Sequence, residues 1–534
     1  MKKKKLEKFY STLKRKIIIP AVTLTMVVSM LTACNSTSKK NETTTTEITT
    51  SSESVSDENT SDNTANASEE IENTNDGEHA IEVDGEEKSY TNVKVTKSGD
   101  SEKNDEADFY GDNSAIFATN KANLTLSNLD VSTNGAHANA VFSYGEGTTV
   151  NISDSTIETS GNCSGGLMTT GGGTMNANNV TIKTSGNSSA AIRSDRGGGT
   201  VTVNGGLYET SGTGSPSIYS TADITVSDAT LSSTTSEGIV IEGKNSVTLN
   251  NCDLTANNTE HNSDKSDVYK GIMIYQSMSG DAASGKATFA ATNGSITNQK
   301  GDVFFVNNTS TDISLENVTI ANEDSTGVFL RAEAAGWGNE GSNGGKVNLN
   351  AKNQTIDGNI IVDDISVLNL YLKEGSAYAG AINAENSSGE IYVELDANST
   401  WTLTGDSYIT SLTCSEGSIN LNGHKLYING KEYKEGSAST GEAIEIKEES
   451  GGNTQDGNKP DSENAQGNAP SGEKPDGEPP EKPDGDSNHT PPSDGGTPPE
   501  KPDGTTGATP KGDSDENTNN SASNSTSSDN NSSV

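Results

Sequence analysis

The chain has 534 residues, of which only 29 % are apolar and 4 % aromatic, and its formal net charge is −40 at pH 7. So few apolar residues cannot fill the thick core of a conventional globular protein of this length, whereas a solenoid has a thin core that needs only a few per coil. The negative charge excludes the basic face that nucleic-acid binding requires and suits a soluble, extended surface protein.

The first 34 residues have the pattern of an export signal. A lysine-rich start precedes an apolar run, Ile17 to Leu31, which is short for a transmembrane helix. The run ends in Leu31-Thr32-Ala33-Cys34, which resembles a bacterial lipobox, where the cysteine is diacylated. We expect acyl chains on Cys34 to hold the protein on the outer face of the bacterial membrane. The alternative is an ordinary signal peptide with an incidental cysteine.

Two low-complexity segments flank the central part of the chain. Residues 35–79 are rich in Ser, Thr, Asn and Glu, and they have too few apolar residues to form a core. Residues 448–534 are rich in Pro, Gly, Asp and Asn and repeat the motif Glu-Lys-Pro-Asp-Gly. We expect a disordered linker, a folded domain over residues 80–447, and a disordered or extended tail.

One short segment recurs from about Ser114 to Val328, at intervals of about 25 residues. It consists of a small residue, a branched apolar residue, a large residue and a second small or apolar residue. The copies begin at Ala115, Ala140, Gly166, Ala191, Ser217, Gly238, Gly271, Asp302 and Gly327. A fixed period of this size indicates stacked supersecondary units.

Two further short segments follow most copies, with apolar residues at every second position, as in Val150-Asn151-Ile152 and Val180-Thr181-Ile182. Period-2 alternation with β-branched residues predicts strands, and no helical stripe competes. The sequence therefore predicts an all-β, single-stranded parallel β-helix with three strands per coil and about 12–13 coils.

Two residues after the second segment of most repeats stands a residue that tolerates left-handed backbone geometry. These residues are Asn128, Asp154, Asn179, Gly205, Asp228, Asn251 and Asn317. A sharp bend between two sheets needs one such residue per coil, and stacked Asn side chains can bond along the axis.

If the branched residues such as Ile116 and Val141 point inward, the residue after each points outward. That predicts an outward ladder of Phe117, Phe142, Met168, Arg193, Tyr219, Val240, Met273, Phe304 and Phe329. Large side chains on an outer face suit stacking on sugar rings or packing on a partner. The alternative is that a loop or one of the flanks covers the ladder.

Three insertions interrupt the repeats, at Ala256 to Lys270, Tyr275 to Lys286 and Arg331 to Lys346. Insertions on one side of a solenoid often mark its working face. Tyr275, Arg331 and Trp337 are therefore candidates for a binding loop, and Trp337 either offers a sugar platform or locks its loop onto the barrel.

No catalytic or metal-ligating pattern emerges. A β-helix lyase needs several carboxylates around Ca²⁺ beside a basic residue, whereas Arg193-Ser194-Asp195-Arg196 predicts a local ion pair that closes a turn. The five His are scattered, and no metal-ligand spacing appears among them. Three cysteines follow Cys34, namely Cys163, Cys252 and Cys414, and this odd number argues against a disulfide framework. We expect no catalytic residue, no metal and no cofactor.

Two stretches, GGLMTTGGGTMNANNVTIKTSGNSSAAIRSDRGGGTVTVNGG and VIEGKNSVTLNNC, resemble a family of clostridial-type, adhesin-like surface lipoproteins. The resemblance covers roughly Ser89 to Lys447 and implies a right-handed parallel β-helix of the pectin-lyase-like class. The family carries no established catalytic motif to transfer.

Together these features predict a lipid-anchored β-helix displayed outside the cell, non-enzymatic, which binds polysaccharide or another host or cell-wall surface like an adhesin and binds no nucleic acid. Two alternatives remain: a polysaccharide lyase or hydrolase with an unrecognised site, and a passive surface stalk or coat.

Overall fold

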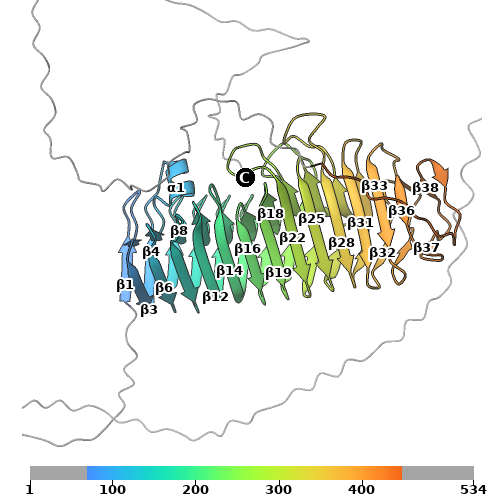
Figure 1. Ribbon diagram of the computed structural model, residues 1–534. Helices are drawn as coiled ribbons and strands as arrows, with labels where there is room; N and C mark the ends of the chain where they lie inside the picture. Colours follow the sequence, from blue (N-terminus) through green and yellow to red (C-terminus); the bar gives the residue numbers. More distant parts are fainter. Residues whose placement is uncertain (1–68, 448–534) are drawn as a thin grey trace, which may run out of the picture. The chain divides into compact units, whose positions relative to one another are not determined.

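The computed structural model describes residues 69–447, which form an elongated stack of parallel strands with one short helix (Figure 1). The predicted parallel β-helix is confirmed, since each strand pairs with its counterpart in the next coil. The lipobox with Cys34, the linker up to residue 68 and the tail from residue 448 lie outside the described residues. Among residues 69–447, no helix is long and apolar enough to span a membrane.

The first sheet contains the recurring segment that defines the repeat, and all its strand pairs are parallel. Its strands are β2 (Ile81–Asp84), β5 (Ile116–Thr119), β8 (Val141–Tyr144), β11 (Leu167–Thr170), β13 (Ile192–Ser194), β15 (Ile218–Ser220), β18 (Ile239–Glu242), β21 (Lys270–Tyr275), β24 (Asp302–Asn307), β27 (Val328–Ala332) and β30 (Asn359–Val362).

The second sheet follows the first in each coil. Its strands are β3 (Glu87–Thr91), β6 (Asn123–Ser127), β9 (Thr149–Ser153), the first halves of β12 (Gly173–Thr184) and β14 (Gly199–Thr210), β16 (Asp223–Ser227), β19 (Ser246–Asn250), β22 (Lys286–Thr292), β25 (Ser310–Glu316), β28 (Lys346–Lys352), β31 (Val367–Lys373), β33 (Glu390–Leu395) and β36 (Ser411–Thr413).

The third sheet completes the coil. Its strands are β1 (Glu69–Asn73), β4 (Val93–Lys97), β7 (Asp130–Thr133), β10 (Thr156–Thr159), the second halves of β12 and β14, β17 (Thr230–Ser233), β20 (Asp253–Ala256), β23 (Ser295–Asn298) and β26 (Thr319–Asn322). The second and third sheets hydrogen-bond as one system because β12 and β14 continue through the bend between them.

The two ends of the solenoid differ. The first strand, β1, pairs with β4 and starts before the expected residue 80; it carries Glu69, Glu70 and Glu72. After β26 the sheets are shorter: β29 (Thr355–Asp357), β32 (Ala377–Ala379), β34 (Thr400–Thr402) and β37 (Ile419–Asn420) form one, and β35 (Ser407–Ile409), β38 (Leu426–Ile428) and β39 (Lys431–Glu432) form another. The last pair, β38 and β39, is antiparallel.

The core is one column of branched apolar side chains along the axis. Ile116, Val141, Leu167 and Ile192 are register partners in successive coils and are buried, as predicted. Alternate residues of the second and third sheets face outward because successive side chains of a strand point to opposite faces. An apolar fraction of 29 % is therefore enough for the fold.

The bend between the second and third sheets depends on the predicted left-handed residues. Asn128, Asp154, Asn179, Gly205, Asp228, Asn251 and Asn317 all have φ between 50° and 70°. Neighbouring side chains bond along the axis, as when Asn179 Nδ2 donates to Asp154 Oδ1 at 2.7 Å and Asn317 Nδ2 donates to Asn293 Oδ1 at 2.8 Å. The predicted ladder of bends is confirmed.

A second ladder forms the turn from the third sheet back to the first. Gly161, Gly186 and Gly212 stack so closely that a Cβ on any of them would lie 1.8 Å from the carbonyl oxygen of the glycine one coil before. Only glycine permits this approach. Ser189 Oγ donates to Gly161 O at 3.1 Å, and Thr184 Oγ1 donates to Ser189 O at 2.5 Å, so the turn is hydrogen-bonded internally.

The insertions all border the first sheet. Helix α1 (Asn104–Tyr110) and residues 257–269 precede first-sheet strands, whereas residues 276–285 and 333–345 follow them. In Figure 1 they rise together along one side of the solenoid. The insertions therefore roof the outward face of the first sheet, and the third sheet is left open.

Candidate functional site

The N-terminal part of the expected ladder lies under α1. Phe117, Phe142 and Met168 point away from the central column and pack together with Tyr144. Gly111, the residue after α1, lies so close that a Cβ there would be 2.4 Å from the Phe117 ring. Phe142 and Met168 are fully buried and Phe117 is 8 % exposed, so this part of the ladder is covered.

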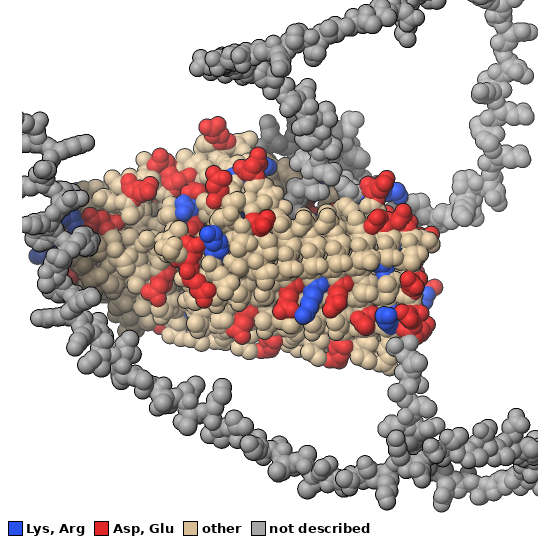
Figure 2. Space-filling view, turned by 180° about the vertical axis from the view of Figure 1, so that it is seen from behind, with Lys and Arg blue, Asp and Glu red and all other residues tan. Residues whose placement is uncertain are grey.

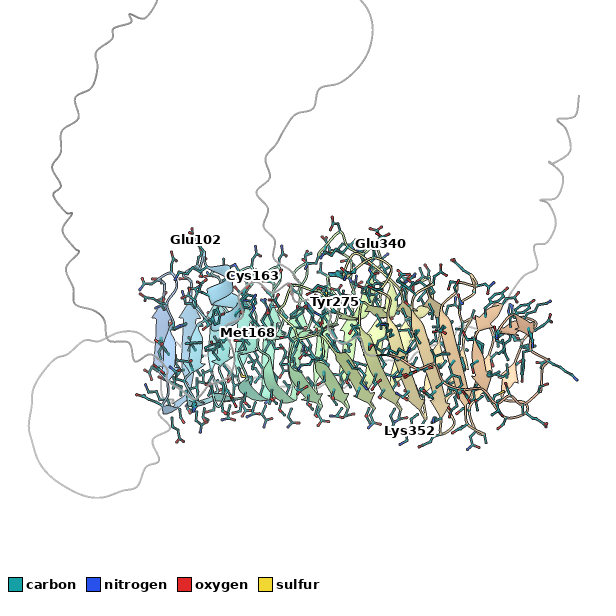
Figure 3. All side chains as sticks on the ribbon, turned by 45° about the horizontal axis from the view of Figure 1, so that its top comes forward. Glu102, Cys163, Met168, Tyr275, Glu340 and Lys352 are labelled. Atoms are coloured by element: carbon teal, nitrogen blue, oxygen red, sulfur yellow. The ribbon has the colours of Figure 1, made fainter. Side chains whose placement is uncertain are left out.

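The C-terminal part of the ladder lies under the other insertions. Tyr219, Val240 and Met273 form a second buried cluster, completed by Ala190, Tyr275, Phe305 and Trp337. Trp337 is only 7 % exposed, and its ring meets the Tyr275 ring edge-on at 5.3 Å. Trp337 therefore holds its loop against the first sheet and does not offer an exposed surface for a sugar ring. Figure 3 shows Met168 and Tyr275 below the insertions that carry Glu102 and Glu340.

The expectation of an exposed ladder is therefore wrong, and the covering alternative is correct. The physical reason is the hydrophobic effect: a continuous row of large apolar side chains is stabilised when chain segments exclude water from it.

Phe304 and Phe329 depart further from the expectation, because both point into the central column. Ile272 pairs with Phe304 and Met273 with Phe305, which is one residue out of the expected register, and such a shift reverses the faces. Phe329 lies at a register irregularity between Val328 and Leu330. The Phe304 ring contacts the Phe329 ring at 5.5 Å inside the core.

A buried carboxylate lies within the second cluster. Glu242 accepts hydrogen bonds from Tyr219 Oη at 2.5 Å, from Tyr275 Oη at 3.1 Å and from Ser277 Oγ. Burial, with the nearby Glu242 charge, raises the pKa of both tyrosines well above the ordinary value, so both remain donors. Three donors on one carboxylate fix the insertion after β21 against the first sheet.

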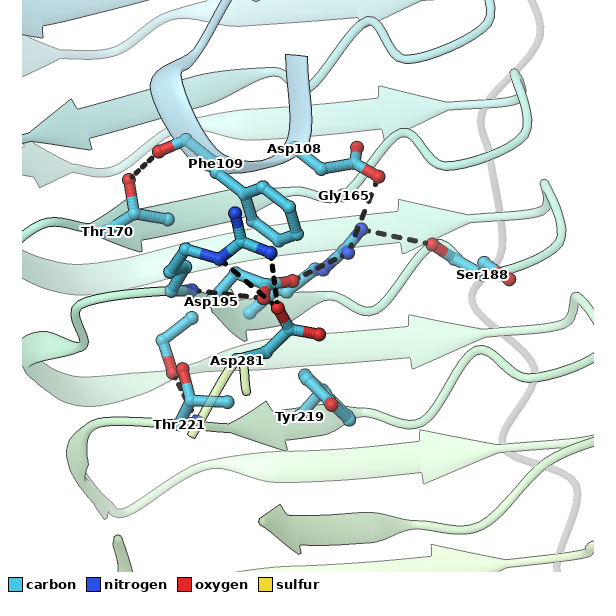
Figure 4. Close-up of polar contacts among 12 residues, drawn as sticks. Asp108, Phe109, Gly165, Thr170, Ser188, Asp195, Tyr219, Thr221 and Asp281 are labelled. Atoms are coloured by element: carbon cyan, nitrogen blue, oxygen red, sulfur yellow. Dashed lines mark hydrogen bonds and ion pairs between the residues drawn. The ribbon is translucent and has the colours of Figure 1, made fainter. Parts of the chain in front are cut away.

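Arg193, the polar member of the ladder, is buried and belongs to the ion pair predicted for this turn. Its Nη2 lies 2.8 Å from Asp195 Oδ2 and 3.8 Å from Asp108 Oδ2 (Figure 4). Burial raises the pKa of Asp195 to about 6, against the opposing effect of Arg193 and with some help from Asp108. The Arg196 guanidinium lies 3.8 Å above the Phe109 ring and pairs with Asp281 at 2.8 Å.

Arg331, a predicted binding-loop residue, is partly exposed and paired. Its Nε donates to Asp302 Oδ2 at 2.5 Å and its Nη1 to Glu333 Oε2 at 3.1 Å. Burial raises the pKa of Asp302, although Arg331 opposes the shift. Arg331, Tyr275 and Trp337 thus lie in the same roofed region, but they present no open sugar platform.

The open site lies on the third sheet, which the sequence analysis did not single out. A groove of about 580 Å³ crosses β4, β7, β10, β12, β14 and β17. One wall is a register column of Thr96, Ser132, Glu158, Lys183, Glu209 and Ser232. Five strand spacings make the groove roughly 24 Å long.

The other side of the groove follows the turns, where Asn134, Ser160, Ser185, Ser211 and Thr234 line it. Most lining residues are Ser or Thr. The charges are mixed, and Lys183 Nζ lies 3.2 Å from Glu209 Oε2. Figure 2 shows one face of the solenoid, where uncharged side chains form long rows and charged ones gather in small mixed groups. The groove thus repeats hydroxyl groups coil by coil with little net charge.

One further cluster joins α1 to the solenoid. His137 Nδ1 lies 3.1 Å from Asp108 Oδ1, and donor atoms of Asp108, His137 and Cys163 all lie within 4.8 Å of one another. Burial disfavours the charged imidazole, but hydrogen bonds with Asp108 and Cys163 outweigh burial and raise the pKa of His137 to about 10. His137 and Cys163 are 26 residues apart at equivalent turns, a signal that the sequence analysis missed.

No protein-family model, no curated protein and no solved structure matched the chain.

Proposed function

We propose that the chain is a cell-surface, adhesin-like protein that binds an extended, neutral polysaccharide along the third-sheet groove and does not cleave it. The observation that carries the proposal is the groove of about 580 Å³, lined coil after coil by Ser and Thr. A polymer with a repeating unit can bond to the Ser160, Ser185 and Ser211 hydroxyls in three successive coils and to the varied polar side chains of the opposite wall, and many modest bonds then add up over the roughly 24 Å length.

The charges of the groove favour a neutral ligand. Glu158 and Glu209 lie in its wall, and the chain as a whole carries a net charge of −40. Within the groove these two carboxylates are balanced by Lys97 and Lys183, so a uronic-acid polymer would gain no attraction there and would be repelled by the chain as a whole, whereas sugar hydroxyls can donate to the carboxylates and accept from Lys183. Lipidation at Cys34 and display on the outer face of the membrane are part of this proposal.

A glycan array probed with the full chain tests the proposal. We expect retention on neutral polysaccharides and little retention on acidic ones. The double variant Ser160→Trp with Ser185→Trp fills the groove from two exposed positions and should abolish retention. The matched control is Ser127→Trp with Ser153→Trp, which places the same side chains on neighbouring coils of the second sheet.

Equal retention by both double variants would contradict binding in the groove. Release of reducing ends or unsaturated products from a retained polysaccharide would contradict the non-enzymatic role and favour a lyase or hydrolase.

A further inference from the structure

We propose that Asp108, His137 and Cys163 form a site for a divalent transition cation of the zinc class, which ties helix α1 to two neighbouring coils. The three residues come from separate parts of the chain: Asp108 from α1, and His137 and Cys163 from successive turns between the third and first sheets. Their donor atoms lie within 4.8 Å of one another. This site is independent of the groove and of its ligand.

The donor set selects the metal. A thiolate sulfur, an imidazole nitrogen and a carboxylate oxygen are the ligands of Zn²⁺, whereas Ca²⁺ and Mg²⁺ take oxygen ligands. Donors around a tetrahedral Zn²⁺ lie about 3.3–3.8 Å apart, given bond lengths of 2.0–2.3 Å. Adjustments of about 1 Å would therefore close the site. Cys163 is only partly buried, which leaves room for water as a fourth ligand.

The surrounding charges permit a cation despite the nearby Arg193. Its guanidinium is balanced by Asp195 at 2.8 Å, so this pair is neutral as a unit. The Asp108 carboxylate and the Cys163 thiolate then supply the two negative charges that a divalent cation requires. Arg193 also lies 3.8 Å from Asp108 Oδ2, which leaves Oδ1 directed toward His137. Such outer contacts orient metal ligands.

The turn ladder provides structure-matched variants. His137, Cys163, Ser188 and Gly214 occupy the same turn position in four successive coils, with φ of 56°, 55°, 54° and 62°. Serine is therefore already accommodated one coil beyond Cys163, and Cys163→Ser should fold like the natural chain. His137→Asn keeps a residue that tolerates left-handed geometry.

Zn²⁺ alone is the probe, added to the full chain with a phosphine reductant. We expect one Zn²⁺ per chain after gel filtration, and affinity at least about 100-fold weaker for Cys163→Ser and for His137→Asn, because losing a direct ligand exceeds the loss of an outer contact. The control Cys252→Ser should bind like the natural chain, since Cys252 is buried elsewhere and bonds to the Val226 carbonyl.

Two measurements on the natural chain complete the test. Zn²⁺ should slow alkylation of Cys163, read peptide by peptide, and should slow amide exchange in α1. Failure of the natural chain to bind Zn²⁺, unchanged affinity in either ligand variant, or unchanged alkylation of Cys163 would each overturn the proposal.

Discussion

The first and third sheets belong to the same coils, yet the outward face of the first sheet is covered and that of the third sheet is open. The first sheet places Phe142, Met168 and Tyr219 outward, and α1 and the long insertions bury them. The third sheet places Ser132, Lys183 and their neighbours outward, and the groove stays open. Outward side-chain chemistry and insertions thus go together: the apolar rows are covered, and the hydroxyl-rich rows stay open.

The largest effect on stability is expected in the covered cluster on the first sheet. Phe142→Ala removes a fully buried ring that contacts Phe117 at a centroid distance of 6.0 Å. We expect a loss of about 3–5 kcal/mol in unfolding free energy, measured by chemical denaturation, because a cavity forms in a closed cluster. Ser132→Ala in the groove is the control and should change stability by less than about 0.5 kcal/mol. Similar losses in both variants would erase the contrast between the two faces.

The stability contributed by the contact between α1 and His137 should depend on pH in the metal-free protein. Asp108 from α1 and Cys163 from the next coil face His137, whose folded pKa is raised from 6.5 to about 10. Arg193 lies on the far side of Asp108, 3.8 Å from its Oδ2. A raised pKa contributes stability that is complete below about pH 6.5 and is lost as the pH rises toward 10. With about 1.4 kcal/mol per pKa unit, the loss should reach a few kcal/mol.

Denaturation at a series of pH values with a chelator present measures this loss. His137→Asn should flatten the curve between pH 6.5 and 10. A natural chain whose stability does not fall over that range would show that the contact contributes nothing.

The Glu242 cluster should give a smaller effect. Tyr219→Phe removes the hydroxyl that donates to Glu242 Oε2 and leaves a buried carboxylate with one donor fewer. We expect a loss of about 1.5–3 kcal/mol in unfolding free energy. Tyr371→Phe, half-buried on the second sheet, is the matched control and should be nearly neutral. If the two variants lose equally, Glu242 does not hold the insertion in place.

The smallest effect is expected in the open groove. Lys183→Met breaks the ion pair with Glu209. The Lys183 side chain is 55 % exposed and the Glu209 side chain is 42 % exposed. Solvent screens such pairs, so thermal unfolding should stay unchanged within error, while retention on a neutral glycan should weaken. A clear drop in the unfolding temperature would assign these residues to the stability of the coil.

The repeating parts of the fold could be predicted from the sequence because their causes are local. Alternation placed Ile116 and Val141 in the core, and the tolerance of Asn and Gly for left-handed geometry located the bend. The outward direction of the ladder side chains was predicted correctly from Phe117 to Met273. At Phe304 the strand pairing shifts by one residue, and no local feature of the sequence signals this shift. The length of an insertion does not reveal which surface it packs against. The sequence therefore left two alternatives open, an exposed ladder and a covered one.

The candidate sites were harder to predict, for two different reasons. His137 and Cys163 could have been paired by aligning the turns, whereas Asp108 enters from an inserted helix whose position depends on tertiary packing. The groove arises from the shape of stacked turns, and an outward Ser or Thr such as Ser160 looks like ordinary solvated surface in a sequence.

The two ends of the solenoid bear on self-association. Among residues 69–447, the first strand β1 places Glu69, Glu70 and Glu72 along an edge of the stack, and at the opposite end β39 runs against β38. The acidic residues of β1 repel a second copy of β1, and the antiparallel β39 cannot continue the parallel pairing of the coils. Both features oppose end-to-end association of the solenoids, to which an endless stack of identical coils would be prone.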